Sequence, residues 1–119
     1  MESKKPKTTI KLERQCEQIA YCIRTGEYDF DSEDSEYDEP CAGDYLKDML
    51  NYWYIINNDK SYKASLILVC CGGPNIWINT RKRCVEGCWG NDEVKMYYYT
   101  DELGIDEYMK ELYGGNKNE

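Results

Sequence analysis

Histidine is absent from the sequence, and this absence removes several kinds of chemistry. Ser-His and Cys-His nucleophile pairs use an imidazole as their base, so the chain can form neither. Zinc sites that combine cysteine with histidine are excluded too, and no Cys-x-x-Cys spacing occurs. We therefore predict that the protein is not an enzyme and has neither catalytic residues nor a cofactor. Turnover of a nucleotide or cyclic oligonucleotide is the alternative.

Long apolar runs are also absent. The longest, residues 66–71, has six residues, whereas a membrane-spanning helix needs about 20. The basic start of the chain is not followed by the apolar segment of a secretory signal. We expect a soluble, cytoplasmic protein that makes no membrane contact.

Phenylalanine occurs once, whereas tyrosine occurs 12 times. Each tyrosine hydroxyl needs a hydrogen-bond partner or water, so we expect many of these rings to be half-exposed. The chain has 119 residues, of which 41% are apolar, which is enough for a packed core. We predict a single domain over residues 1–119, with residues 1–8 and 114–119 flexible.

Cysteine occurs seven times, and an odd number argues against complete pairing. Cys22, Cys70 and Cys71 lie among apolar residues, which favours reduced cysteines buried as small hydrophobic side chains. Cys84 and Cys88, on one strand, would lie about 13 Å apart, too far to share a metal ion. We predict no metal site; a zinc site and a disulfide framework are the alternatives.

The net negative charge of the chain is confined to residues 27–39. The chain has 23 acidic and 15 basic residues, which gives a net charge of −8. This segment alone contains eight carboxylates and neither Lys nor Arg, so the other residues carry no net charge. Its candidate partner-binding residues are the carboxylates and two tyrosines: Glu27, Tyr28, Asp29, Asp31, Glu33, Asp34, Glu36, Tyr37, Asp38 and Glu39.

An acidic run of this kind either stays solvated or binds a basic surface. Stretched at about 3.3 Å per residue, its charges would be about 5 Å apart. DNA carries one phosphate per about 3.4 Å on each strand, so the two charge densities agree within a factor of about two. A segment of this charge density could occupy a Lys/Arg-lined channel meant for nucleic acid, although the charge pattern alone does not favour this over a solvated loop. A solvated loop that confers only solubility is the alternative.

The N-terminal residues have the apolar spacing of a helix that starts near Thr9. One stripe recurs at i, i+4, i+7 and i+11: Leu12, Cys16, Ile19 and Ile23, widened by Ala20. We expect Thr8 or Thr9 to cap this helix and Gly26 to follow its last turn. After the acidic loop at residues 27–40, a short second helix is predicted from Asp44 to Leu50.

Five later segments have the composition of strands separated by turn residues: 52–56, 62–71, 75–80, 84–89 and 94–99. Residues 62–71 are apolar on both faces, which predicts a central strand covered on both sides. A last helix, from Asp101 or Asp106 to Tyr113, is expected to end at Gly114-Gly115. The fold class is therefore α+β: an antiparallel sheet of four to five strands with an N-terminal, a short second and a C-terminal helix.

Three short motifs have structural explanations. Gly72-Gly73-Pro74 is followed by a strand, whereas a phosphate-binding loop opens into a helix. Asp29, Asp31 and Glu33 do not satisfy the calcium-loop pattern, which requires Asp or Asn and then Gly at the next positions. Arg81-Lys82-Arg83 is too short to predict direct nucleic-acid binding and fits a hairpin turn.

Residues 71–80, CGGPNIWINT, and residues 85–90, VEGCWG, resemble a family of small proteins carried by phages and conjugative elements of Gram-positive gut bacteria. That family shares a GGPNI(W/Y)(V/I)(D/N)T core and a later aromatic-Trp-Gly segment, where this chain has Cys88 as the residue before Trp-Gly. The resemblance covers roughly residues 52–90. We assign this motif to the fold, with glycines for a corner between strands and Trp77 as a packing anchor.

Small acidic proteins of such elements commonly act against host defence, so the resemblance implies an anti-CRISPR or anti-restriction function. Together with the charge pattern, it predicts an inhibitor of Cas9 that mimics DNA in the bacterial cytoplasm. An anti-restriction protein, or a structural or regulatory module of a mobile element, is the alternative. Homodimerisation through an exposed sheet edge is left open.

Overall fold

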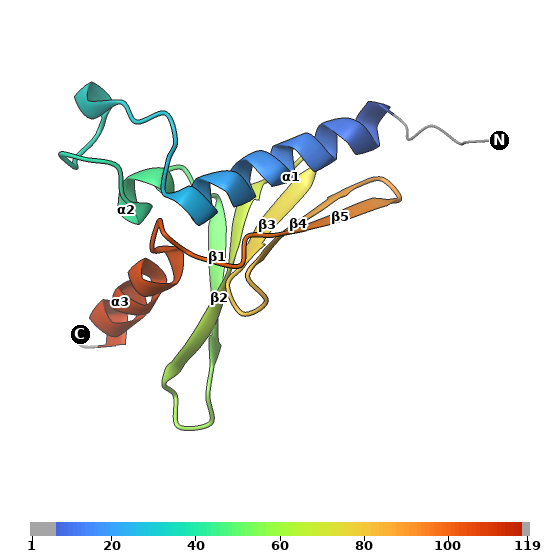
Figure 1. The fold of residues 1–119 in the computed structure, drawn as a ribbon. Coiled ribbons are helices and arrows are strands. Elements are labelled where there is room, and N and C mark those ends of the chain that lie inside the picture. Colours follow the sequence, from blue (N-terminus) through green and yellow to red (C-terminus); the bar gives the residue numbers. More distant parts are fainter. Residues whose placement is uncertain (1–6, 118–119) are drawn as a thin grey trace.

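A computed structural model describes residues 7–117 of the chain, with side chains to residue 115 (Figure 1). The elements in chain order are α1 (Lys7–Thr25), a 3-10 turn (Ser32–Asp34), α2 (Ala42–Tyr45), β1 (Asn51–Ile56), β2 (Tyr62–Cys70), β3 (Asn75–Asn79), β4 (Cys84–Trp89), β5 (Asp92–Tyr97) and α3 (Ile105–Lys117). The α+β class, the antiparallel sheet and the three helices are as the sequence predicted.

The strands form one antiparallel meander in the order β1-β2-β3-β4-β5. The β4–β5 hairpin corrects one prediction, because β5 begins at Asp92 and ends at Tyr97 instead of spanning residues 94–99. Asp92 pairs with Trp89, which leaves only Gly90 and Asn91 for the turn. Gly90 adopts φ 63°, a value that suits glycine in a two-residue hairpin turn.

The core lies on one face of the sheet. The predicted stripe of α1 faces it: Leu12, Cys16, Ala20 and Ile23 are fully buried. α1 packs against β4 and β5, while α3 packs against β2 (Figure 1). A single cluster joins these helices to Ile67, Ile78 and Val85 of the sheet, so the domain has one apolar layer between its helices and its strands.

The opposite face of the sheet, which we call the open face, is uncovered by helices within the described part of the chain. It presents Trp53 beside Leu66, and Leu68 beside Trp77, and none of the four packs against the core. The prediction that residues 62–71 form a central strand covered on both sides was therefore wrong. β2 is second in the sheet order, and its outer leucines are half-buried by neighbouring tryptophans instead of by a second layer.

The N-terminal end of α1 differs from the capping prediction, whereas its C-terminal end agrees with it. The helix begins at Lys7, so Thr8 and Thr9 lie inside its first turn instead of capping it. Thr9 Oγ1 donates a hydrogen bond of 2.7 Å to Asp92 Oδ2, which ties the start of α1 to β5. Gly26 has φ 76° and its N–H donates to the Cys22 carbonyl, as expected for a glycine that ends a helix.

The other two helices are shifted from their predicted bounds. α2 comprises Ala42–Tyr45 instead of residues 44–50, and residues 46–48 continue as turns. α3 starts at Ile105, where the Asp101 carboxylate accepts backbone N–H groups of the first turn, and it continues through Gly114 to Lys117. Residues 7–8 and 114–117, predicted to be flexible, are thus helical; the rest of those predictions lies outside the described residues.

All seven cysteines are free thiols. Of the three that lie among apolar residues, Cys22 is buried as expected, Cys70 is half-buried, and Cys71 is exposed because β2 ends one residue before it. Cys16 and Cys84 are buried as well. Within residues 7–117, no three acidic or cysteine side chains lie close enough together to hold a metal ion. None of the helices described there is long and apolar enough to cross a membrane.

Candidate partner-binding surface

Residues 27–39, the acidic loop, connect α1 to α2 and project beyond the sheet at the C-terminal end of α1 (Figure 1). All eight carboxylates of this loop are exposed. The structure therefore brings the predicted acidic residues together on one solvent-facing segment.

The loop is folded back on itself instead of extended. Asp31 accepts a hydrogen bond of 3.0 Å from the Glu33 N–H and so caps the short 3-10 turn. Ser35 Oγ accepts a similar bond, 3.0 Å long, from the Tyr37 N–H. The spacing expected for an extended strand therefore does not apply to the whole segment.

Asp44 of α2 is the buried anchor of the acidic loop. Its side chain is 3% exposed, and its Oδ2 accepts a hydrogen bond of 2.6 Å from the Tyr28 hydroxyl. Hydrogen bonds from Ser35 and Tyr28, with the nearby Lys47 ammonium, hold the pKa of Asp44 below its ordinary value of 3.8 despite burial. Lys47 Nζ also lies 3.7 Å from Asp34 Oδ2, so the same lysine holds the middle of the loop.

Tyr28, one of the candidate partner-binding residues, faces inward. Its ring packs edge-on against Tyr45, with centroids 5.0 Å apart, and its hydroxyl accepts the Cys41 N–H at 3.2 Å. Burial and the hydrogen bond to Asp44 raise the pKa of Tyr28 to about 12. The structure thus gives Tyr28 an anchoring contact within the protein, and its role in partner binding stays a prediction.

Tyr37 lies against α2 at Gly43. A Cβ at position 43 would lie 2.7 Å from Tyr37 Cζ and 3.2 Å from Tyr108 Cε1, so only glycine leaves room for the ring. Beside this contact is a hollow of about 310 Å³ whose walls include Asp34, Glu36 and both tyrosines. Lys47 lines it too and already pairs with Asp34, so Glu36 is the carboxylate there that a partner's cation would meet first. Carboxylates next to aromatic rings make an environment that suits a guanidinium or ammonium group.

Three residues that hold the loop were not predicted: Gly43, Asp44 and Lys47. Asp44 was taken as the start of a helix, and the sequence around it gives no signal that a carboxylate 16 residues beyond Tyr28 binds its hydroxyl. Only the small pair Ala42-Gly43 beside two apolar residues suggested close packing at this point.

The GGPNIW motif has the predicted structural role. Gly72-Gly73-Pro74 connects β2 to β3, and Gly72 has φ 98°. Trp77, however, is not a core anchor: Ile76 and Ile78 point into the core, and the intervening Trp77 lies half-buried on the open face. The basic residues 81–83 form the β3–β4 turn, where Asn79 Oδ1 accepts the N–H groups of Arg81 and Lys82.

Models of known protein families, curated proteins and solved structures were compared with the chain, and none of them matches it. The arguments about function below therefore start from the acidic loop and its anchors.

Proposed function

We propose that this protein is a non-enzymatic binding protein that presents its acidic loop to the basic nucleic-acid-binding surface of another protein. The supporting observation is an acidic loop of eight exposed carboxylates that is tied to α2 through Tyr28, Tyr37 and Lys47. A loop that is already held in place loses less conformational entropy on binding than a free acidic tail does.

In this proposal the carboxylates take the places of phosphates in a Lys/Arg-lined channel. A partner's arginine or lysine enters the hollow between Asp34, Glu36 and Tyr37, where it meets both negative charge and an aromatic ring. Association is fast at low salt and weakens as salt screens the charges. The inhibited protein is a nuclease that must bind DNA before it cleaves.

Cas9 is the first partner to test, because the GGPNIW core resembles proteins of mobile elements that act against host defence. The corresponding place of action is the cytoplasm of a bacterial host. A restriction nuclease would be approached through the same acidic loop, so one assay with both classes of enzyme separates the two partners.

The test is a DNA-cleavage assay with purified Cas9 and guide RNA. The protein is added before or after the target DNA, at low and at high salt. We expect inhibition only when the protein is added first, and weaker inhibition at high salt. Inhibition of a type I restriction nuclease but not of Cas9 would move the proposal to that enzyme, and inhibition of neither would overturn it.

Two matched variants separate the acidic loop from net charge. One carries Glu33→Gln, Glu36→Gln and Glu39→Gln; the other carries Glu93→Gln, Glu107→Gln and Glu111→Gln. All six glutamates are exposed, so both variants lose three charges at little structural cost. We expect the first variant to inhibit at least about tenfold less well, corresponding to about 1.4 kcal/mol, and the second to resemble the wild type. Equal losses in both variants would argue against the acidic loop as the binding surface.

A further inference from the structure

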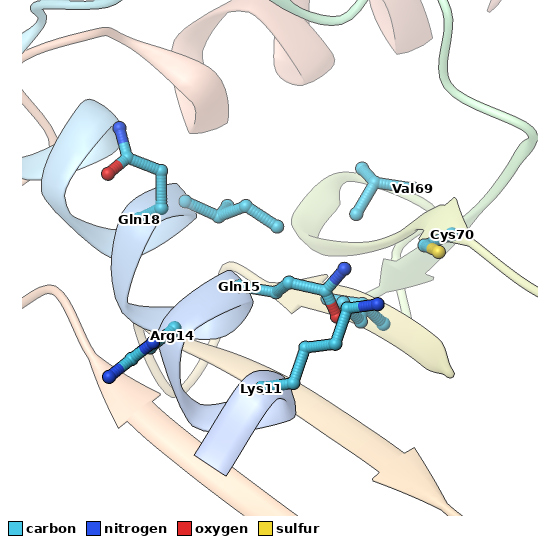
Figure 2. A pocket seen from close by; sticks show the side chains of 8 residues that line it. Lys11, Arg14, Gln15, Gln18, Val69 and Cys70 are labelled. Atoms are coloured by element: carbon cyan, nitrogen blue, oxygen red, sulfur yellow. The ribbon is translucent and has the colours of Figure 1, made fainter. Parts of the chain in front are cut away.

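A groove runs between α1 and the end of the sheet where β2 and β3 meet (Figure 2). α1 covers β4 and β5, and α3 covers another part of β2, so neither helix fills this space. The groove has a volume of about 430 Å³. Its apolar floor consists of Ile19, Val69, Cys70 and Ile76. Size and lining are those of a small-molecule site with an apolar base.

The rim of the groove is basic, which is unexpected in a chain of net charge −8. Lys11 and Arg14 of α1 line it, and among the described residues no carboxylate forms an ion pair with either. The side chain of Lys11 extends toward Cys70, whereas Arg14 points away from Val69 and Cys70 (Figure 2). Lys11 Nζ lies 5.8 Å from the centre of the Trp89 ring, an interaction that leaves its charge uncompensated by an anion.

Gln15 adds an unsatisfied amide to the same rim. Its side chain extends over the groove next to Lys11 (Figure 2). Its Oε1 is buried and has no hydrogen-bond partner within the described residues. Oε1 is an acceptor and offers nothing to an anion, but the Nε2 group of the same amide donates hydrogen bonds, so it is the Nε2 end of Gln15 that can bind an anionic group beside Lys11.

A second hollow, of about 230 Å³, continues the groove toward α2 and shares Ile19 and Val69 with the first. Its far wall includes Met49 and Asp48. The groove is thus polarised, with a cation at the Lys11 end and a carboxylate at the α2 end. An anionic group is attracted to the first end and repelled from the second, while the floor between them accepts an apolar chain.

We propose that this groove binds a small amphipathic carboxylate, whose carboxylate lies at Lys11 and Gln15 and whose apolar chain lies on Ile19, Val69 and Ile76. At about 30 Å³ per non-hydrogen atom, the first hollow holds roughly a dozen such atoms, the size of decanoate. A phosphate or nucleotide fits less well, because the floor is apolar and, among residues 7–117, Lys11 is the one cation that extends over it. This site is separate from the acidic loop and does not depend on the proposed function.

Decanoate is the probe, and decanol and decyltrimethylammonium are its uncharged and cationic counterparts. Isothermal titration calorimetry gives the affinities, and amide chemical shifts give the location. We expect decanoate to bind with a dissociation constant on the order of 100 μM, and the cation to bind at least about tenfold more weakly. Shift changes should be concentrated at Val69, Cys70 and Ile76. No saturable binding below about 5 mM, or changes confined to the open face, would overturn the proposal.

Lys11→Gln tests the charged end of the site, and Lys82→Gln in the β3–β4 turn is the control with the same change of charge. We expect Lys11→Gln to weaken decanoate binding about five- to tenfold while leaving decanol binding unchanged. If Lys82→Gln weakened decanoate binding equally, the effect would be due to net charge and the proposed site would be wrong. Val69→Thr, which keeps the shape of the side chain, should weaken decanoate and decanol to the same extent; unchanged binding would also contradict the proposal.

Discussion

The hydroxyl of Tyr28 donates a hydrogen bond of 2.6 Å to Asp44, and this contact joins the beginning of the acidic loop to the helix that follows it. The two residues are 16 positions apart, and the carboxylate is almost completely buried. The contact explains how a segment with eight like charges keeps a defined path: one carboxylate outside the segment collects hydrogen bonds from within it.

Tyr28→Phe removes this hydroxyl and keeps the ring. We expect a lower thermal midpoint, by about 4 °C, because a buried carboxylate loses one hydrogen bond. Amide exchange in residues 29–38 should accelerate as well. Tyr21→Phe is the control, since the Tyr21 ring is exposed and stacks only near Arg24. If both variants had the same thermal midpoint as the wild type, Tyr28 would not be an anchor of the acidic loop.

Gly43→Ala tests the contact with Tyr37 without changing any charge. The new methyl group would collide with the Tyr37 ring, which is the mobile end of an exposed side chain, so the ring moves and the stability changes by less than about 1 kcal/mol. The acidic loop, however, loses its position on α2. In the cleavage assay we expect inhibition about three- to tenfold weaker than that of the wild type. Unchanged inhibition would indicate that charge alone is sufficient.

Gly87→Ala tests the close approach of α1 to β4. A Cβ at this position would lie 2.7 Å from Cys16 Sγ and 2.9 Å from Leu12 Cδ1, both fully buried. We expect a loss of about 1–3 kcal/mol in the free energy of unfolding, measured with urea. The double variant with Cys16→Ala should recover part of it, since the sulfur that collides is gone. Gly73→Ala, with open space around it, is the control.

Alkaline pH should unfold the protein through its buried tyrosines. Burial raises the pKa of Tyr98, and that of Tyr62 is raised by burial and by the hydrogen bond to Asp106. The unfolded state therefore loses these protons first, near pH 10. Stability is complete below that pH and falls as pH rises above it, by up to about 1.4 kcal/mol per pH unit for each such tyrosine.

Urea unfolding at pH 8, 10 and 11 measures this loss. Tyr98→Phe should lower the sensitivity to alkali, because it keeps the buried ring and removes one ionisable group. Tyr99→Phe, at a residue that is 71% exposed, should leave the sensitivity unchanged. A steeper fall with Tyr98→Phe than with the wild type would contradict the assignment.

Most of the fold was predictable because its signals are local. The apolar stripe of α1, the turn residues between strands and the Gly26 stop each depend on neighbours within a few positions. The helix bounds that were wrong depend on distant partners. Thr9 was a candidate cap of α1, but it lies inside the helix and its hydroxyl donates to Asp92 on β5, a partner that neighbouring residues do not indicate. The start of α3 is local instead: Asp101, one of the two predicted starts, precedes the helix and its carboxylate accepts the N–H groups of Gly104, Ile105 and Asp106.

The candidate surface was predictable only in its charge. The sequence predicted that the eight carboxylates are exposed, because carboxylates without Lys or Arg nearby in the sequence are rarely buried. It did not locate their anchors, because the Tyr28–Asp44 contact and the fit of Tyr37 over Gly43 are tertiary. The single apolar layer was missed for a related reason: β2 is apolar on both sides, and cross-strand tryptophans cover one of them in place of a helix.

The two outer strands of the sheet differ in charge. β5 carries Asp92, Glu93 and Lys95, which discourage a further strand from pairing with it, whereas β1, with the sequence NYWYII, carries no charge at all. We therefore expect that any protection against self-association at β1 comes from the repulsion between whole molecules, whose net charge resides in the acidic loop. Salt, or neutralisation of the loop, removes that repulsion, so colloidal stability and partner binding should decline together. Light scattering alongside each inhibition assay would separate a variant that has lost its partner from one that has begun to associate with itself.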